Sequence, residues 1–445
     1  MKKLVPLALL LITCCHGLFS QNKFIIQNKK QVTKVNFKLI NNLIVIPVKV
    51  NGVDLSFILD TGVSKPIIFN FLNASDSLNL KSSESIFMRG LGGGEVVEAS
   101  KSQRNIFEIG EAISIEQDLF SVYDLGVDFG SRLGVPIHGI IGLDIFKDFV
   151  VEIKYVSGHI KLTKPELYKY KSCRKCERLN LEFYNDKPYL NAHVSMGGNK
   201  IPVKLLIDSG GSDSLWLFED DSLGIQSGSN YFKDFLGRGL SGSVFGKRGR
   251  IGALHLSSFV LKNVNVAYPD STSIVHAKRV KVRNGSLAGN VLKRFNIVLD
   301  YNKALITISK NKNFKEKFSY NRSGIELAHQ GMRLIKEYEP SSYKVFGKNQ
   351  SDGDNSATFH LSRQYKLLLK PAIAVVELRE HSAAYNAGLK KGDIILSVNG
   401  KSTHQMELQS IMLDFYGNVG KQIRLKVERG QDILTFTFRL ESLLD

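Results

Sequence analysis

Two aspartates, each at the end of an apolar run, are the residues of this sequence best suited to chemistry. FILDTG (57–62) sets Asp60 after three large apolar residues, and LLIDSG (205–210) does the same with Asp208. A buried carboxylate is costly unless nearby donors stabilise it, and the following hydroxyl residue and glycine supply donors and a tight turn. Two such carboxylates brought face to face share a proton, so one can activate water as a general base while the other acts as a general acid.

Other chemistries find less support. His138, His159, His193 and His255 are isolated and lack ligand spacing, and no G-x-S-x-G motif occurs. Cys173 and Cys176 form a C-x-x-C with no second cysteine pair in the mature chain, so we predict a local disulfide rather than a zinc or redox site. We expect neither a metal ion nor a cofactor.

The sequence segments that must position the aspartates occur twice in the chain. DTGVSKPIIF corresponds to DSGGSDSLWL, RGLGGG (89–94) to RGLSGS (238–243), HGIIGLDIF to GSLAGNVL, and FKDFVVEIKY to LKRFNIVLDY. The blocks recur in one order at a nearly constant spacing of about 150 residues, which indicates a duplicated domain. Arg89 and Arg238 stand at corresponding positions; two interpretations remain open, substrate contacts or solvated side chains.

Each copy is typical of β structure. VIPVKV-NG-VDLSFILD places β-forming runs around Asn51-Gly52, a strong hairpin signal, and YLNAHVSMGGNKIPVKLLID has the same form. The polar stretches 165–178 and 311–323 mark boundaries. Beyond them, residues 372–378 favour a strand, Gly388 ends a short helix, and residues 403–416 favour a helix whose apolar positions follow i, i+3, i+4, i+7.

Residues 40 to 310 resemble the aspartic proteases, in particular the retropepsin-like branch found in bacterial exported proteins. The resemblance implies that Asp60 and Asp208 form a catalytic pair and that each glycine-rich segment is a flap over the substrate. Val63 and Gly211 depart from the Ser or Thr of pepsin-like sites, and Pro66 is also unusual. The implied supporting residues are Thr61, Gly62, Ser209, Gly210, Gly142 and Gly289, and the implied flap residues are Arg89, Gly90, Leu91, Gly92, Arg238, Gly239 and Leu240.

Residues 320 to 445 resemble a PDZ domain in the sequence pattern SAA…AGLKKGD…IL.VNG. The resemblance implies peptide binding by strand addition beside a helix. We place the groove strand at Tyr365, Leu367 and Leu369. A folding or docking appendage without a ligand is the alternative.

Composition and the N-terminal segment limit the expected partners and cellular location. Sixty Lys and Arg against 42 Asp and Glu give a formal net charge of +18, but no basic stretch is interleaved with aromatic residues, so we do not expect nucleic-acid binding. The start MKKLVPLALLLITCCHGLFSQ is typical of a secretory signal, and Cys14 and Cys15 leave a lipoprotein signal as the alternative. We expect an exported protein of the periplasm or cell envelope.

The sequence thus predicts a mainly β fold of two duplicated retropepsin-like lobes followed by an α+β PDZ domain. The hypothesis for function is a single-chain aspartic endopeptidase whose PDZ domain recruits peptide or protein substrates. The competing hypothesis is a non-catalytic peptide-binding envelope protein with a protease-like cleft. The predicted segments are a signal peptide (1–20), lobe 1 (21–164), a linker with the C-x-x-C (165–178), lobe 2 (179–310), a second linker (311–323) and the PDZ domain (324–445).

Overall fold

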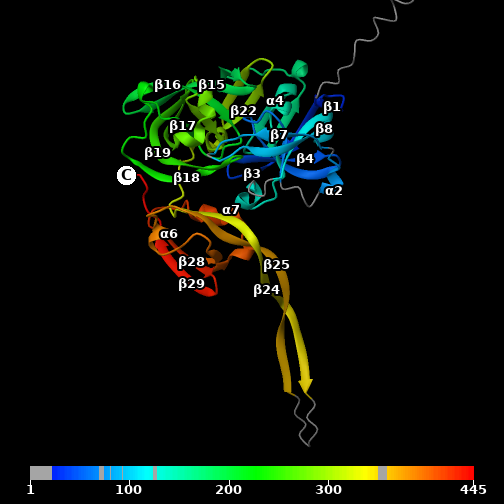
Figure 1. Cartoon of the computed structure of the whole chain (residues 1–445), viewed down its shortest axis with the longest axis vertical. Coiled ribbons are helices and arrows are strands. Elements are labelled where there is room, and N and C mark those ends of the chain that lie inside the picture. Colours follow the sequence, from blue (N-terminus) through cyan, green and yellow to red (C-terminus); the bar gives the residue numbers. More distant parts are fainter. Residues whose placement is uncertain are drawn as a thin grey trace, which may run out of the picture.

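The computed structural model describes residues 23–69, 75–80, 82–92, 94–123, 128–348 and 358–444. The predicted signal peptide lies outside the described residues. Figure 1 shows a large β-rich body, a smaller C-terminal domain beneath it, and a long two-stranded ribbon that projects away from both.

The first half of the body is built on one sheet with the strand order β1-β9-β6-β10-β5-β4-β8-β7 and with β3 paired to β4. Asn51 and Gly52 both have positive φ angles, 48° and 87°, as the turn of the β4–β5 hairpin requires. The short strand β10 lies between β5 and β6 and runs parallel to β5. The strands are β1 (Ile25–Ile26), β3 (Lys38–Ile40), β4 (Leu43–Val50), β5 (Val53–Leu59), β6 (Ile67–Ile68), β7 (Ser82–Met88), β8 (Val97–Ile109), β9 (Ala112–Val122) and β10 (Gly139–Ile141).

The second half has a sheet of the order β14-β15-β16-β21-β17-β20-β19-β18. Here β21 lies between β16 and β17 and runs parallel to β16, as β10 does between β6 and β5. The segment β17-β21-β16-β15 therefore repeats the arrangement β6-β10-β5-β4. The strands are β14 (Glu182–Tyr184), β15 (Lys187–Met196), β16 (Asn199–Asp208), β17 (Leu215–Leu217), β18 (Tyr231–Gly239), β19 (Gly242–Leu256), β20 (Phe259–Pro269) and β21 (Gly285–Ala288).

A third sheet joins the two halves in the order β13-β23-β22-β11-β12-β2. Its centre is the antiparallel pair β11–β22, with one strand from each half, and buried residues of both halves form one hydrophobic core. The halves are therefore fixed to each other by backbone hydrogen bonds as well as by packing. The strands are β2 (Val32–Asn36), β11 (Val150–Lys154), β12 (His159–Thr163), β13 (Cys176–Asn180), β22 (Phe295–Asp300) and β23 (Leu305–Lys310).

The segments predicted as linkers are attached to the body. The first ends in β13, which pairs with β23, and it contains a disulfide between Cys173 and Cys176. In the second, the buried Tyr320 donates a hydrogen bond to the carbonyl of Val266, at 3.1 Å. Neither segment is a free tether.

Helices are short. In the body, α4 follows β10 and α5 follows β21, again at corresponding places. The α-helices are α2 (Ser75–Leu78), α3 (Phe129–Leu133), α4 (Leu143–Asp148), α5 (Gly289–Leu292), α6 (Ala383–Asn386) and α7 (Leu408–Asp414). The 3-10 turns are η2 (Pro165–Leu167), η3 (Asp221–Leu223), η4 (Ser271–Ile274), η5 (Ala277–Arg279), η6 (Lys312–Lys315) and η7 (Thr403–Gln405).

The C-terminal domain has a sheet of the order β24-β25-β26-β28-β29, with β27 paired to β26, and its own hydrophobic core. The helix predicted over 403–416 is present as η7 followed by α7. Leu408 and Ile411 of α7 and its C-cap Phe415 pack into this core. The strands are β24 (Ile325–Lys348), β25 (Thr358–Leu378), β26 (Ile394–Val398), β27 (Lys401–Ser402), β28 (Gln422–Arg429) and β29 (Asp432–Arg439).

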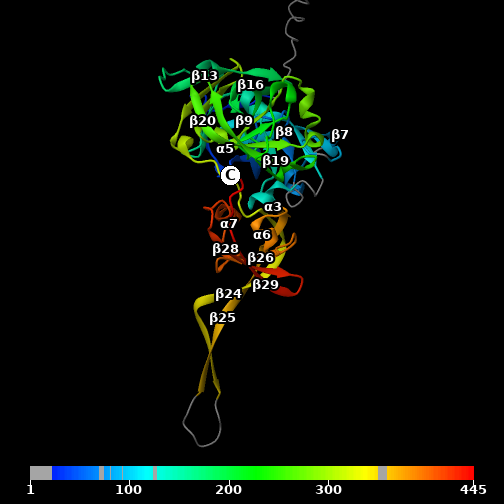
Figure 2. The same ribbon diagram turned by 90° about the vertical axis from the view of Figure 1, so that its left-hand side faces the viewer.

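The position of the predicted groove strand needs a correction. Tyr365, Leu367 and Leu369 lie on the ribbon formed by β24 and β25, where they are exposed, and their cross-strand partners are residues of β24. Both strands are far longer than the usual five or six residues, so the ribbon leaves the domain, as Figure 2 shows. Within this domain α7 contacts β24.

Candidate active site

Asp60 and Asp208 occupy equivalent places in the two halves. Asp60 directly follows β5, and its backbone N–H donates to the carbonyl of Ile141 on β10, at 2.9 Å. Asp208 ends β16, where it pairs with Ala288 of β21. In each half, a parallel neighbouring strand (β10 or β21) fixes the backbone of the aspartate at the end of its strand.

A reciprocal hydrogen-bond network joins the two aspartate loops. Thr61 Oγ1 donates to the carbonyl of Ile207 (2.7 Å) and accepts from the N–H of Ser209 (3.0 Å). Ser209 Oγ donates to the carbonyl of Leu59 (2.8 Å) and accepts from the N–H of Thr61 (3.1 Å). Both side chains are buried. The four bonds have the symmetry of a two-fold axis that passes between the loops, so the loops hold each other in place.

The same network brings the carboxyl groups together. A Cβ atom added to Gly210 would lie 2.3 Å from Asp60 Oδ2, and one added to Gly62 would lie 3.8 Å from Asp208 Oδ1. Each carboxyl group therefore lies against the glycine of the opposite loop. The N–H of Gly62 donates to Asp60 Oδ1 at 2.6 Å. Glycine is required at position 210 because any side chain there would displace Asp60.

Burial controls the charge of the pair. Burial first, and then the charge of Asp208, raise the pKa of Asp60 to about 7, against the opposing effects of the Gly62 N–H and Lys187. Burial also raises the pKa of Asp208, opposed by the cations Arg283 and Lys187. At weakly acidic pH, one proton shared between the two carboxyl groups is the favoured state, since two adjacent buried charges repel.

The two predicted supporting glycines have a steric role. A Cβ on Gly142 would lie 1.8 Å from the carbonyl oxygen of Asp60, and a Cβ on Gly289 would lie 2.4 Å from the carbonyl oxygen of Asn42. The N–H of Gly289 donates to the carbonyl of Gly211 at 2.8 Å. Both glycines let a neighbouring chain approach the aspartate loops closely.

The two glycine-rich segments form the tips of hairpins that meet over the aspartates. The hairpins are β7–β8 and β18–β19, and their tips exchange backbone hydrogen bonds. The N–H of Gly94 donates to the carbonyl of Ser241 (2.8 Å), and the N–H of Ser241 donates to the carbonyl of Leu91 (3.1 Å). A Cβ on Gly90 would lie 2.6 Å from Leu240 Cβ. The flap tips of the two lobes thus interlock through backbone hydrogen bonds and close packing.

The flap arginines differ in their contacts. Arg89 Nη1 lies 2.7 Å from His276 Nε2 at the surface. Both Arg89 and Arg238 line the cavity that contains the aspartates, as do Gly90, Leu91, Gly239 and Leu240. This cavity has a volume of about 1170 Å³ and reaches from both lobes to the C-terminal domain.

Comparison with protein families agrees with this geometry. Residues 46–145 match the aspartyl protease family model, and residues 375–429 match a PDZ domain model. The chain carries an aspartyl protease domain followed by a PDZ domain. A comparison with curated proteins gives no match.

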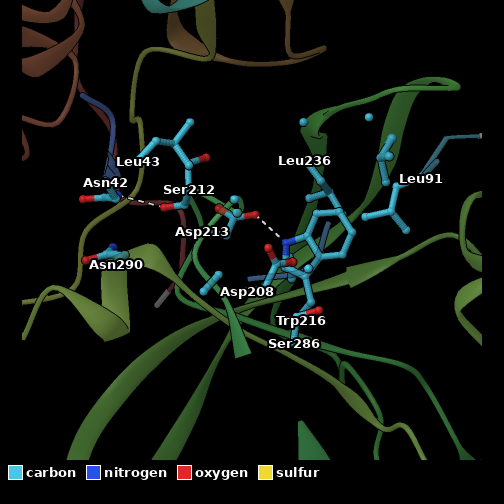
Figure 3. Close-up of a pocket in the computed structure, with 18 of the residues that line it drawn as sticks. Asn42, Leu43, Leu91, Asp208, Ser212, Asp213, Trp216, Leu236, Ser286 and Asn290 are labelled. Atoms are coloured by element: carbon cyan, nitrogen blue, oxygen red, sulfur yellow. Dashed lines mark hydrogen bonds between the residues drawn. The ribbon is translucent and has the colours of Figure 1, made fainter. Parts of the chain in front are cut away.

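The cavity around the aspartates also contains a chain of hydrogen-bonded and charged side chains that the sequence did not suggest, part of which Figure 3 shows. We call it the ionic chain. Trp216 Nε1 donates to Asp213 Oδ2 at 2.7 Å, and Asp213 Oδ1 accepts from Arg248 Nη1 at 2.7 Å. Arg248 Nε also donates to Asp234 at 3.0 Å. Asp208 and Trp216 line the same cavity, and Figure 3 draws both. A signal existed, because Trp216 is the only tryptophan of the chain and follows Asp208 closely.

Two cations of the protease domain near the pair were also missed. Arg283 donates to the carbonyl of Gly285 (3.2 Å) and to Ser286 Oγ (2.7 Å), and its guanidinium lies over the Phe218 ring. Lys187 begins β15 and lines the cleft. Neither belongs to a repeated block, so no pattern in the sequence marked them.

Two of the histidines considered from the sequence make hydrogen bonds to residues other than the aspartate pair. His138 Nδ1 accepts from the backbone N–H of Ser56, and His255 contacts Ser195. Among the described residues no group of His, Cys, Asp and Glu could hold a metal ion. In the same part of the chain no helix is long and apolar enough to span a membrane.

Proposed function

We propose that this protein is an aspartic endopeptidase in which Asp60 and Asp208 hydrolyse peptide bonds with one water molecule. The observation that carries the proposal is the pair of buried carboxyl groups, each held against the opposite loop by the reciprocal bonds of Thr61 and Ser209. The raised pKa of both groups supports a shared proton.

The shared proton leaves one carboxyl group ionised and the other protonated, and the proposed reaction uses both. The ionised carboxylate takes a proton from water as the oxygen attacks the scissile carbonyl, and the protonated carboxyl group donates its proton to the carbonyl oxygen. The newly protonated carboxyl group then gives its proton to the leaving amine nitrogen, the ionised one takes a proton from a hydroxyl of the tetrahedral intermediate, and the C–N bond breaks. The two carboxyl groups exchange roles in the first step and return to the starting state in the second.

The other residues position these groups. Thr61, Gly62, Ser209 and Gly210 hold the loops, and the flap hairpins exclude water from the cleft once substrate is bound. The PDZ domain recruits a peptide or protein, because this kind of domain binds an extended chain as an added strand.

The organisation of the chain is part of the proposal. We infer that the two lobes descend from a duplicated domain, since their strand orders, aspartate loops and flaps correspond. One chain then supplies both halves of the site and needs no second copy. The basic, apolar start of the sequence supports export to the periplasm or cell envelope.

Cleavage of a peptide library by the mature protein tests the function. We expect Asp60→Asn and Asp208→Asn each to lower kcat/KM by about 10³-fold or more, because each removes a group that moves a proton. Asp54→Asn is the matched control, since Asp54 is a highly exposed aspartate of the same lobe. Cleavage that survives either dyad substitution would exclude this mechanism. A parent protein that cleaves nothing at any pH would instead support the non-catalytic peptide-binding hypothesis.

A further inference from the structure

The helix α7 of the PDZ domain presents a second apolar face outside its own core. Leu408, Ile411 and Phe415 are buried inside the domain, whereas Leu413 is 70 % exposed and Tyr416 is 38 % exposed. Gln409, Met412, Leu413 and Tyr416 line the same cavity as Asp60 and Asp208. Figures 1 and 2 both show α7 on the side of the PDZ domain that meets the protease body.

Lobe 2 holds the PDZ domain in this place through β18, the first strand of its flap. Arg379 Nη1 lies 3.5 Å from Asp234, and the Arg379 guanidinium lies 4.7 Å from the centre of the Phe232 ring. Both ionic partners are largely buried. Charged groups removed from solvent in this way bind in a defined geometry.

Lobe 1 holds the domain through α3. Arg132 Nη2 lies 3.3 Å from Glu377 of β25, and Gln409 Nε2 donates to the carbonyl of Leu133 at 3.3 Å. A Cβ on Gly134 would lie 2.7 Å from Leu408 Cβ, so the chain after α3 touches the first residue of α7. Because α3 also contacts β24, lobe 1 touches the PDZ domain at β24 as well as at α7.

These contacts leave the outer face of α7 turned toward the catalytic cleft. The cavity volume of about 1170 Å³ exceeds the roughly 300–1,000 Å³ of small-molecule pockets, as a site for an extended peptide requires. An exposed leucine and tyrosine that line such a cavity are suited to apolar side chains of a bound chain.

We propose that α7 is a wall of the substrate-binding cleft and that Met412, Leu413 and Tyr416 contact apolar substrate residues distant from the scissile bond. The occupant is the substrate polypeptide itself, because the cavity is continuous from the aspartates to α7. The PDZ domain thereby determines which long substrates are cleaved. This inference rests on the proposed function for its catalytic readout and on the cavity for its geometry.

A peptide ladder tests the proposal. The shortest library peptide that the full-length mature protein cleaves is extended stepwise at each end with leucine–serine repeats. In the parent, kcat/KM should rise once an extension reaches α7. In Leu413→Ser, the ratio of kcat/KM for the longest peptide to that for the shortest should fall about tenfold, mainly through KM, since one apolar contact is lost. Ile433→Ser is the control, because Ile433 is 52 % exposed on β29 and does not line the cavity.

The outcomes separate this inference from the proposed function. An unchanged ratio in Leu413→Ser, or an equal loss for all peptide lengths, would overturn the role of α7. If the parent cleaves no peptide, peptides selected from a displayed random library by the Asp60→Asn variant serve as binding probes. A tenfold loss of their affinity on Leu413→Ser would then uphold the α7 wall although the catalytic proposal had failed, and unchanged affinity would reject it.

Discussion

The two lobes build the same aspartate loop and then surround it differently. Thr61 and Ser209 make matching bonds across the axis between the loops. In the cavity that Asp208 lines, however, lobe 2 adds the chain from Trp216 through Asp213 to Arg248. Aligning the two aspartates places Lys65 and Ile68 of lobe 1 opposite Asp213 and Trp216, so lobe 1 cannot form this chain.

The cations that act on the two aspartates also differ. Arg283 opposes the raised pKa of Asp208 but does not act on Asp60 in the same way, whereas Lys187 acts on both. Burial raises the pKa of both carboxyl groups, but the charges around them differ. The comparison teaches that the symmetric centre creates the dyad, whereas the periphery of the two lobes is asymmetric. Through Asp234 and Arg379, that periphery also connects one side of the cleft to the PDZ domain.

The largest expected difference between the lobes concerns their loop glycines. In Gly210→Ala the new methyl group would meet Asp60 Oδ2 at 2.3 Å, whereas in Gly62→Ala it would meet Asp60 Oδ1 at 3.1 Å. We expect kcat to fall about 100-fold in the first variant and about tenfold or less in the second, because a displaced carboxyl group loses its alignment. Steady-state peptide cleavage measures both, with circular dichroism to establish folding. Equal losses would mean that the two loops respond alike and that the difference in spacing has no consequence.

Because of the ionic chain, removing a charge from lobe 2 should lower the free energy of unfolding more than removing the corresponding charge from lobe 1. Asp213→Asn removes a partner of Arg248, whose side chain is 13 % exposed, so we expect the free energy of unfolding to fall by about 2 kcal/mol. Lys65→Gln at the corresponding place in lobe 1 should change it by about 0.5 kcal/mol at most. Urea denaturation followed by circular dichroism compares the two. A stable Asp213→Asn variant would show that Asp234 alone suffices for Arg248.

The smallest effect concerns pH. Activity requires one proton on the pair, so it should fall as pH rises through the raised pKa, which lies near 7 for Asp60. Hydroxyl groups introduced by Val63→Ser with Gly211→Ser would donate to the ionised pair, lower its pKa and move this alkaline limb down by less than about one pH unit. A Cβ at 211 would lie 3.4 Å from Asp208 Oδ2, which places a donor within reach.

A pH–rate profile of peptide cleavage measures this shift. Val63→Ala with Gly211→Ala supplies the control, since alanine adds a side chain at 211 without a donor. An optimum in strong acid that the serine variant leaves in place would contradict the assigned cause. Ser64 and Ser212, one residue further along, would then be the donors to investigate.

Much of the site was predictable because its signals are local. The hairpin at Asn51-Gly52 and the apolar runs before Asp60 and Asp208 follow from the alternation of side chains and from the freedom of glycine at positive φ. The paired flaps were predicted from the repeated glycine-rich blocks together with the resemblance to aspartic proteases. The groove strand was misplaced, since nothing in residues 365–369 distinguishes a strand inside a domain from one in a projecting ribbon.

The sequence by itself determined that this protein has two carboxylate loops, two glycine-rich hairpins and a C-terminal domain with its own core, because these depend on neighbours along the chain. Only the tertiary structure decided that Arg283 and Asp208 line one cavity, that the flap tips interlock, and that Leu413 of α7 lines the same cavity. The physical reason is that these contacts join residues far apart in sequence. Their geometry depends on how whole sheets pack, which no short pattern of residue types encodes.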